Sequence, residues 1–338
     1  MTYTKKIERP QPNCVGNPTT ARSVYHLTLA GIALCMASAS QATTNFPQGP
    51  VEMIVPFAAG GGLDQNARAF SKAFSEILNT PVAVVNRDGA AGAIGLAGLA
   101  GAKADGQTLA FTPAVSLTSQ PHRVKSIKYN LESFTPVCQV FDNIFAIAVL
   151  SNSPYKTLSD VIAKARAEPD SVSYGTSGIG SIPHLGTADI EAAANVRLNH
   201  IAYKGDGPMM QDLLGGRLGF GAVLASSVAS QVQAGTLRLI AVYSDRRHPG
   251  FASVPTLKEA GVPVVQLSFG GVLAPAKTPT EVLQKLQSSC ERAAKSPAYL
   301  EWAAKAGQVV DYLPAEDFAR KLREDSQSKE ATIKRLGL

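Results

Sequence analysis

The chain has 338 residues, of which 45% are hydrophobic, 17% are charged and 7% are aromatic, and its formal net charge is +6. Because a domain usually takes roughly 100–200 residues, this length predicts two domains with buried cores and argues against a disordered chain. The basic excess is spread along the sequence without a Lys/Arg block, which argues against a nucleic-acid-binding protein.

Residues 1–42 are typical of a secretory signal peptide. Four basic residues precede an uncharged stretch at 27–36, and small residues follow at Ala37, Ala39 and Ala42. A positive leader, a short apolar core and a small-x-small site mark such a peptide, and the apolar core is shorter than the ~20 residues that span a bilayer. We expect cleavage near Ala39 or Ala42 and export of a soluble chain; a buried N-terminal helix is the alternative.

Cleavage would remove four of the 32 basic residues and one of the 26 acidic residues and leave a net charge of about +3. It would also leave two cysteines, Cys138 and Cys290. These are too far apart in sequence for a zinc knuckle or a CxxC redox pair. In an oxidising compartment they form either one disulfide or two separate buried thiols, and the sequence leaves both open.

After the leader, short apolar runs alternate with helix-sized segments. The runs predicted as strands lie at 51–55, 82–85, 108–111, 171–174, 199–202, 219–224 and 238–243. Between the first two, Phe70 and Phe74 follow helical spacing; helix starts are predicted at Thr157 and Thr278, and a long charged helix from Pro314 to the end. Strands separated by helices predict an α/β fold with parallel sheets.

Two glycine-rich loops each follow a predicted strand and precede a predicted helix. The first runs from Pro56 to Asp64 and includes Phe57, Ala58, Ala59, Gly60, Gly61 and Gly62. The second runs from Tyr174 to His184 and includes Thr176, Ser177, Gly178, Ile179, Gly180 and Ser181. Such loops lie beyond the carboxyl ends of strands, and glycines with helix N-terminal amides favour an anion such as a carboxylate. Two of them on two domains predict a ligand held between the domains, whereas a tight turn without a ligand is the alternative for each.

Asp64 and His184 each allow two interpretations. Asp64 is either the N-cap of the first helix or a carboxylate that faces the ligand. For His184 we expect a hydrogen bond back to its own loop. No HExxH motif or close spacing of His and acids occurs, so we predict no metal site.

The sequence after residue 45 lacks the common enzyme motifs. It contains no GxGxxG dinucleotide fingerprint, no GK[ST] phosphate loop and no GxSxG nucleophile elbow, because Ile179 stands where the elbow after Ser177 needs glycine. We therefore predict a binding protein with no catalytic residue and no cofactor. A secreted serine hydrolase that uses Ser177 or Ser181 with His184 is the alternative from another class.

Short blocks in one order along the chain carry a family resemblance. They are Pro56-Phe57-Ala58-Ala59-Gly60-Gly61 with Asp64 and Arg68, Asn86-Arg87, Ala104-Asp105-Gly106, Tyr174-Gly175 through His184, Tyr203-Lys204-Gly205, Asp212-Leu213-Leu214-Gly215-Gly216, Val254-Pro255-Thr256 and Leu273-Ala274-Pro275. From about Phe46 to Leu338 the chain resembles the substrate-binding proteins of tripartite tricarboxylate transporters, also called Bug receptors.

The resemblance implies a two-domain periplasmic binding protein of the type II, Venus flytrap architecture, with the ligand cleft between the domains. We place domain 1 at residues 46–147 plus 270–338 and domain 2 at residues 148–269. The expected ligand is a small organic carboxylate, aromatic or aliphatic, captured by hinge closure. The expected partner is a membrane permease of the tripartite type or, alternatively, a sensor kinase, and the protein itself is expected to be a monomer that binds no nucleic acid.

Carried over by position, the loops from Phe57 to Gly62 and from Thr176 to Ser181 would hold the ligand carboxylate through amides, hydroxyls and ordered waters. Phe57 would cover one face of the ligand, and Asp64 would contact its distal part. Ser116 and Tyr203 would line the far wall; ordinary packing is their alternative role.

Two departures from the family pattern bear on the ligand. Residues 218–223 lack the acids that the family usually has there, and Phe269-Gly270 replaces a bulkier aromatic pair. If these positions face the cleft, the pocket is less acidic and roomier than usual. That favours an aromatic or longer aliphatic carboxylate over an amino acid.

Overall fold

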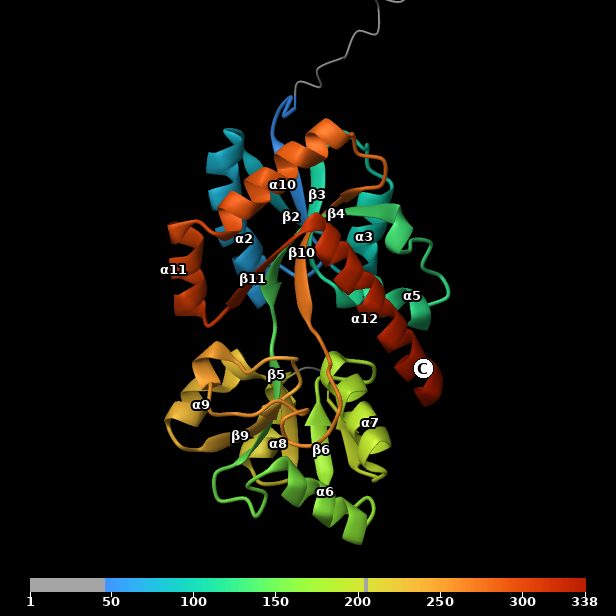
Figure 1. Ribbon diagram of the computed structural model, residues 1–338, viewed down its shortest axis with the longest axis vertical. Helices are drawn as coiled ribbons and strands as arrows, with labels where there is room; N and C mark the ends of the chain where they lie inside the picture. Colours follow the sequence, from blue (N-terminus) through green and yellow to red (C-terminus); the bar gives the residue numbers. More distant parts are fainter. Residues whose placement is uncertain (1–45, 204–205) are drawn as a thin grey trace, which may run out of the picture. The chain divides into compact units, whose positions relative to one another are not determined.

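The computed structural model describes residues 46–203 and 206–338, so the predicted leader and its cleavage sites lie outside the described residues. Two β-sheets organise this part of the chain (Figure 1). The first has the order β11-β4-β10-β3-β1-β2 and is built from β1 (Val51–Val55), β2 (Val82–Asn86), β3 (Thr108–Pro113), β4 (Phe134–Asp142), β10 (Phe269–Pro275) and β11 (Val309–Pro314). The second has the order β7-β6-β8-β5-β9 and is built from β5 (Phe145–Leu150), β6 (Ser173–Thr176), β7 (Asn199–Ala202), β8 (Phe220–Leu224) and β9 (Leu237–Val242).

We call the residues built around the first sheet the first lobe and those built around the second sheet the second lobe. The helices of the first lobe are α2 (Gly62–Leu78), α3 (Ala93–Ala100), α4 (Val115–Thr118), α5 (Gln120–Arg123), α10 (Thr280–Ala294), α11 (Pro297–Ala306) and α12 (Ala315–Leu336). Those of the second lobe are α6 (Leu158–Ala167), α7 (Ile182–Ala194), α8 (Asp206–Leu214) and α9 (Ala229–Gln233). Short 3₁₀ turns lie at Ala90–Gly92, Leu131–Ser133, Ala225–Val228 and Pro249–Phe251.

All seven predicted strands are present within two residues of their expected ends, and the long C-terminal helix is α12. The predicted parallel pairing is present in both sheets, but each sheet is mixed. β1 pairs parallel with β2 and β3, and β6 with β7 and β8, but β10 runs antiparallel to β3 and β4, β11 to β4, and β5 to β8 and β9. β5 and β10 are the strands through which the chain enters each sheet from the other lobe. The predicted domain limits fall within β5 and at the start of β10, and the exact division stays a prediction.

Each sheet has a hydrophobic core on both faces, because side chains alternate across a strand. In β1, Val51, Met53 and Val55 face one core and Ile54 faces the other. The first core is closed by α2, α10 and α11, and the second by α3, α4 and α12. In Figure 1, α2 and α10 accordingly lie next to one another. The second sheet is covered in the same way by α6 and α7 on one face and by α8 on the other.

Cys138 of β4 and Cys290 of α10 are joined by a disulfide. The sequence left open whether these cysteines form a disulfide or two separate thiols, and the structure shows the disulfide. Both residues are buried in the core that α2 and α10 close, so the bridge ties a helix to the sheet across 152 residues of chain.

A buried ion pair anchors α12 to the rest of the first lobe. The Nζ atom of Lys329 donates to the Asp325 carboxylate and to the carbonyl of Leu267, just before β10. Thr118 of α4 donates to the same carboxylate at 2.6 Å. The Lys329 side chain is 1% exposed and that of Asp325 is 4% exposed, so neither charge has water as a substitute partner.

We predict that Lys329→Ala destabilises the protein by about 3–5 kcal/mol, because it leaves the Asp325 carboxylate buried without its cation. The control is Lys334→Ala, which removes the exposed pair of Lys334 with Glu330 on the same helix and costs less than about 1 kcal/mol. Urea unfolding followed by circular dichroism measures both variants. Equal losses in the two variants would contradict this assignment.

Candidate functional site

The two glycine loops lie at corresponding edges of the two sheets. The chain leaves the first sheet at Asp142, the end of β4, and enters the second at Phe145. Phe145 pairs with Leu224, the end of β8, while Phe269 at the start of β10 pairs with Asp142. The chain therefore crosses between lobes at the carboxyl ends of the parallel strands. The first loop follows β1 and the second follows β6 at these same edges, where ligands of α/β sheets bind.

Asp64 holds the first loop in shape. The helix α2 begins at Gly62 with Gly61 as its N-cap residue, so the interpretation of Asp64 as the N-cap is wrong. Its carboxylate accepts hydrogen bonds from the Gly60 amide at 2.8 Å, from Arg68 Nε at 2.9 Å and from Asn86 Nδ2 at 2.9 Å. The hydrogen bond from Arg68, with those from Gly60 and Asn86, lowers the pKa of Asp64 to about 2. The carboxylate is thus ionised at neutral pH and bound to donors of its own lobe.

The backbone in front of this helix is open. Ala58, Ala59, Gly60, Gly61 and Gly62 are exposed, and a Cβ atom added at Gly60 or Gly62 would meet nothing within 4 Å. Gly60 has φ +81°, a conformation that favours glycine. Asn86 at the end of β2 donates to the Phe57 carbonyl at 2.9 Å and so fixes the start of the loop. The open side of the loop is where a ligand can approach the backbone.

A third segment joins this loop, and we did not predict it from the sequence. Residues 89–92 all have positive φ values, of 123°, 47°, 52° and 94°. Ser116 donates to the Ala91 carbonyl at 3.0 Å, and a Cβ at Gly92 would clash with Ser116 and lie 3.4 Å from the Phe57 ring. Phe57, Gly92 and Ser116 therefore form one wall. Two alanines in a left-handed conformation are strained, and such strain clusters at functional sites. The sequence signal was Gly-Ala-Ala-Gly shortly after a strand.

The second loop is folded around Thr176 and His184. Thr176 Oγ1 lies 2.8 Å from His200 Nε2, and its carbonyl accepts from the Tyr203 amide at 3.0 Å. The Gly180 amide donates to His184 Nδ1 at 2.9 Å, which confirms the predicted bond of this histidine to its own loop. Gly178 and Gly180 have φ values of +140° and +73°, so this path of the backbone favours glycine at both positions.

His184 is uncharged at neutral pH. Burial, with the neighbouring His200 and Arg123, lowers its pKa to about 4. Its ring stacks on His200 with a centroid distance of 4.1 Å. Because Nδ1 accepts the Gly180 N–H, the proton of the neutral ring is on Nε2. His184 is therefore a structural partner of the loop and carries no charge towards a ligand.

The remaining predicted residues of the second lobe lie beside this loop. The Ser177 side chain is hydrogen-bonded to Asp206 at the start of α8. Ser181 is the N-cap residue of α7, but its hydroxyl caps no amide. The Tyr203 hydroxyl donates to Asp212 at 2.6 Å, and its ring lies against Gly175, 3.2 Å from where a Cβ would stand. Tyr203 thus supports the loop through its ring and its backbone, while its hydroxyl is bound to α8.

The two departures from the family pattern do not line an open cleft, so the expectation of a roomier and less acidic pocket is wrong. Leu218, Phe220 and Val223 are buried in the cores of the second lobe. Phe269 is buried against α12, and a Cβ on Gly270 would clash with the ring of Phe141. The glycine makes room for a neighbouring aromatic side chain and leaves no extra space for a ligand.

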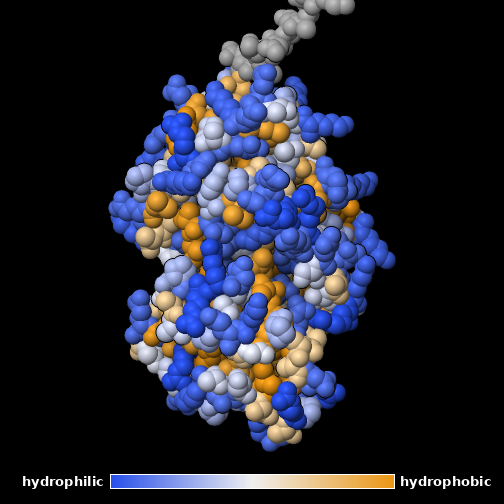
Figure 2. All heavy atoms as spheres, viewed as in Figure 1, coloured by the Kyte–Doolittle hydropathy of each residue, from blue (hydrophilic) through white to orange (hydrophobic). Residues whose placement is uncertain are grey.

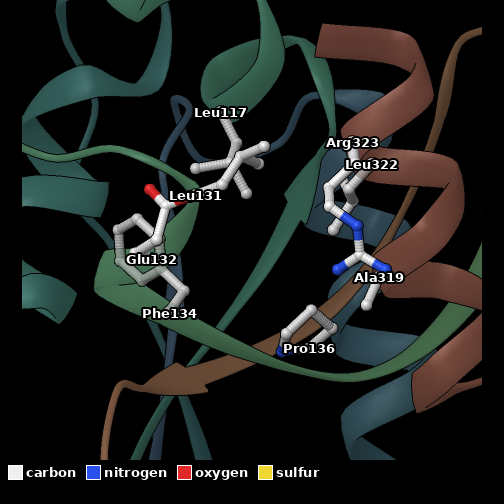
Figure 3. A pocket seen from close by; sticks show the side chains of 8 residues that line it. All are labelled: Leu117, Leu131, Glu132, Phe134, Pro136, Ala319, Leu322 and Arg323. Atoms are coloured by element: carbon white, nitrogen blue, oxygen red, sulfur yellow. The ribbon is translucent and has the colours of Figure 1, made fainter. Parts of the chain in front are cut away.

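A separate pocket of about 180 Å³ lies within the first lobe (Figure 3). Its apolar lining carries Glu132 and Arg323, and none of the predicted site residues takes part.

Within residues 46–203 and 206–338, no group of three or more His, Cys, Asp or Glu side chains is placed to hold a metal ion. None of the described helices combines the length and apolarity needed to cross a bilayer, and the face seen in Figure 2 is mainly hydrophilic.

A family profile described as tripartite tricarboxylate transporter family receptor matches residues 66–338. The chain belongs to this family. Members of the family are periplasmic solute-binding receptors of two-domain α/β architecture, so the predicted class of fold and function is confirmed.

Relatives of this receptor resemble it over most of its length. BugT of Bordetella pertussis is 33% identical over 290 residues, which cover 83% of this chain and 88% of BugT. A UPF0065 protein of Cupriavidus necator is 31% identical over 318 residues, covering 94% and 97%. Among solved structures, a TctC solute-binding protein from Polaromonas without ligand is 30% identical with a TM-score of 0.79, covering 86% and 99%. A protein from R. palustris with adipate is 28% identical with a TM-score of 0.72, covering 87% and 99%.

We predict that Asp64→Asn changes the acid stability of this receptor. The pKa of Asp64 is lowered in the folded state from 3.8 to about 2, so its stabilising contribution is complete above about pH 4 and is lost as the pH falls towards 2. A shift of this size corresponds to about 2 kcal/mol at neutral pH. The Asn variant should therefore be less stable at pH 7 and lose less on acidification, as measured by thermal melts from pH 7 to pH 2.

The control is Asp317→Asn, an acid at the start of α12 whose side chain is 39% exposed. It should melt like the parent at pH 7. A parent-like acid profile for Asp64→Asn would show that this carboxylate does not hold the loop.

Proposed function

We propose that this receptor captures a small organic carboxylate between its two glycine loops and presents the closed form to a permease of the tripartite type. The single observation that supports this most directly is the position of the loops. Each leads from a strand end into a helix N-terminus, and both lie at the sheet edges where the chain crosses between lobes. We further propose that residues 1–42 are a signal peptide and that the mature receptor is a periplasmic monomer.

The chemistry around the loops supports an anion as ligand. The amides at a helix N-terminus and the helix dipole favour negative charge. Asp64, the acid of the first loop, is neutralised by Arg68 through an ion pair of 2.9 Å. The R. palustris protein, which is 28% identical to this receptor, was solved with adipate, and this supports a carboxylate as the ligand. In the proposed arrangement Phe57 covers one face of the ligand, with Gly92 and Ser116 beside it.

The same geometry supports binding without catalysis. A serine hydrolase needs a histidine nitrogen that accepts the proton of the nucleophile. In His184 the Nδ1 atom accepts the Gly180 amide, so the neutral ring has no free acceptor nitrogen. Ser177 is hydrogen-bonded to Asp206 instead. We expect no turnover of p-nitrophenyl acetate above the rate of a His184→Ala variant. Sustained turnover in the parent that is lost in Ser177→Ala would overturn the non-catalytic proposal.

The first loop offers a sharp test of the binding site. Gly62 is the first residue of α2, and the space in front of it is empty, so Gly62→Leu places a side chain in the proposed cleft without a clash. Ligand at 100 times its dissociation constant stabilises a protein by about 2.7 kcal/mol. We predict that adipate, malate or benzoate raises the melting temperature of the parent and that Gly62→Leu abolishes this rise.

The unliganded melting temperature of Gly62→Leu should equal or exceed that of the parent, because leucine is favoured over glycine in a helix. Gly101→Leu is the control, since it adds the same side chain at the exposed end of α3, where a Cβ is in ordinary contact with the Ala97 and Gly98 carbonyls at 3.7 and 3.9 Å. Gly101→Leu should retain the full ligand response. A full response in Gly62→Leu would show that the first loop is not the site.

A further inference from the structure

Arg123 is a residue of the first lobe that reaches the second glycine loop. It ends α5, and its Nη2 atom donates to the Ile179 carbonyl at 3.3 Å. Its guanidinium lies directly on Gly180, where an added Cβ would come within 2.6 Å of Nε and Nη1. A side chain at Gly180 would therefore displace the Arg123 guanidinium, in addition to the strain that the φ value of +73° imposes on any other residue.

Two donors at this contact are left without partners. Arg123 Nε is buried and has no hydrogen-bond partner, and the same is true of the hydroxyl of Ser181. Ser181 follows Gly180 directly and precedes the first turn of α7. Buried polar groups are nearly always satisfied, so two unsatisfied donors on adjacent parts of one contact indicate an acceptor that binds between them.

The charge of Arg123 is also uncompensated. None of the ion pairs formed among residues 46–203 and 206–338 includes this arginine, whereas Arg68 at the first loop is paired with Asp64. Asp206, at the start of α8, is hydrogen-bonded to Ser177. Arg123 thus puts a permanent positive charge beside the N-terminus of α7, at a position where the family resemblance suggested amides, hydroxyls and ordered waters.

We propose that Arg123 is a ligand-binding and specificity-determining residue of this receptor, whose Nε–H donates to a carboxylate of the ligand together with the hydroxyl of Ser181. The inference rests on the proposed function and deepens it. Nη2 keeps its bond to Ile179, so the carboxylate is held by both lobes at once and stabilises the closed form. A site built from charged donors selects the ionised acid and rejects the amide of the same shape.

Isothermal titration of the purified full-length protein and its variants tests this. The probes are adipate, malate and benzoate, each paired with its amide, and the pair with the tightest acid is carried through the variants. Arg123→Gln should weaken binding of the acid by about 10-fold to 100-fold and leave the weak binding of the amide unchanged. Arg123→Lys keeps the charge without the planar fork and should fall in between. Ser181→Ala should weaken the acid by a smaller factor.

The matched control is Arg166→Gln on α6, whose Nη2 also donates to a backbone carbonyl, that of Ala194, at 3.1 Å but within the second lobe. It should bind like the parent. Parent-like affinity of Arg123→Gln for the acid would overturn the assignment. Equal losses of affinity for acid and amide would also overturn it, because they indicate that Arg123 joins the two lobes without contacting the ligand. If Arg123→Gln does not fold, the same readings on Arg123→Lys decide. If Arg123→Gln binds like the parent while Gly62→Leu has lost its response to ligand, the assignment of Arg123 fails and the proposed function stands. A parent that binds none of the acids overturns both the assignment of Arg123 and the proposed function.

Discussion

The architecture depends on the place where the chain passes between its two sheets. Only Asn143 and Ile144 separate β4 from β5, and Asn143 is bonded to Ser268, the residue before β10. Both crossings therefore lie side by side at the carboxyl edge of the parallel strands. A strand that enters a sheet at that edge runs opposite to the strands that end there, which is why β5 and β10 are antiparallel. The same constraint puts the loops after β1 and β6 at the crossing, so topology alone assembles the candidate site.

Charged side chains reinforce this crossing. Arg246 of the second lobe binds Asp142 at 2.6 Å and Asp311 at 2.9 Å in the first lobe, and Lys321 of α12 reaches the same two acids. Burial raises the pKa of Asp142 to about 6, with Asp311 adding to the rise and the cations Lys321 and Arg246 opposing it. Near neutral pH the carboxylate is therefore mostly ionised and its cations stay in place. A ligand that contacts both lobes shifts the balance between open and closed forms by its differential affinity.

Local patterns in the sequence predicted the elements, and tertiary contacts decided the rest. The strands, the glycine loops and the capping of α6, where Thr157 accepts the Asp160 amide and Asp160 accepts the Thr157 amide, could be read from spacing. The helix start predicted at Thr278 lies two residues later, at Thr280 with Pro279 as the N-cap residue, and the Thr278 hydroxyl donates to the Pro275 carbonyl. Gly270 was interpreted as missing bulk, since a sequence does not show that Phe141 fills that space. The contact of Arg123 with Gly180 joins residues 57 positions apart on different lobes, and no local pattern indicates it.

The distribution of satisfied and unsatisfied donors separates scaffold from binding surface. Asp64, Asn86, Thr176 and His184 use polar atoms to fix the two loops. Within the described part of the chain, five buried side-chain polar atoms have no hydrogen-bond partner, and two of them, Arg123 Nε and Ser181 Oγ, belong to one contact. Leaving such groups unpaired is costly, and two unpaired donors at one contact between the lobes therefore support the proposed ligand there. A carboxylate has two acceptor oxygens and a negative charge that balances the positive charge of Arg123. One carboxylate therefore satisfies both donors.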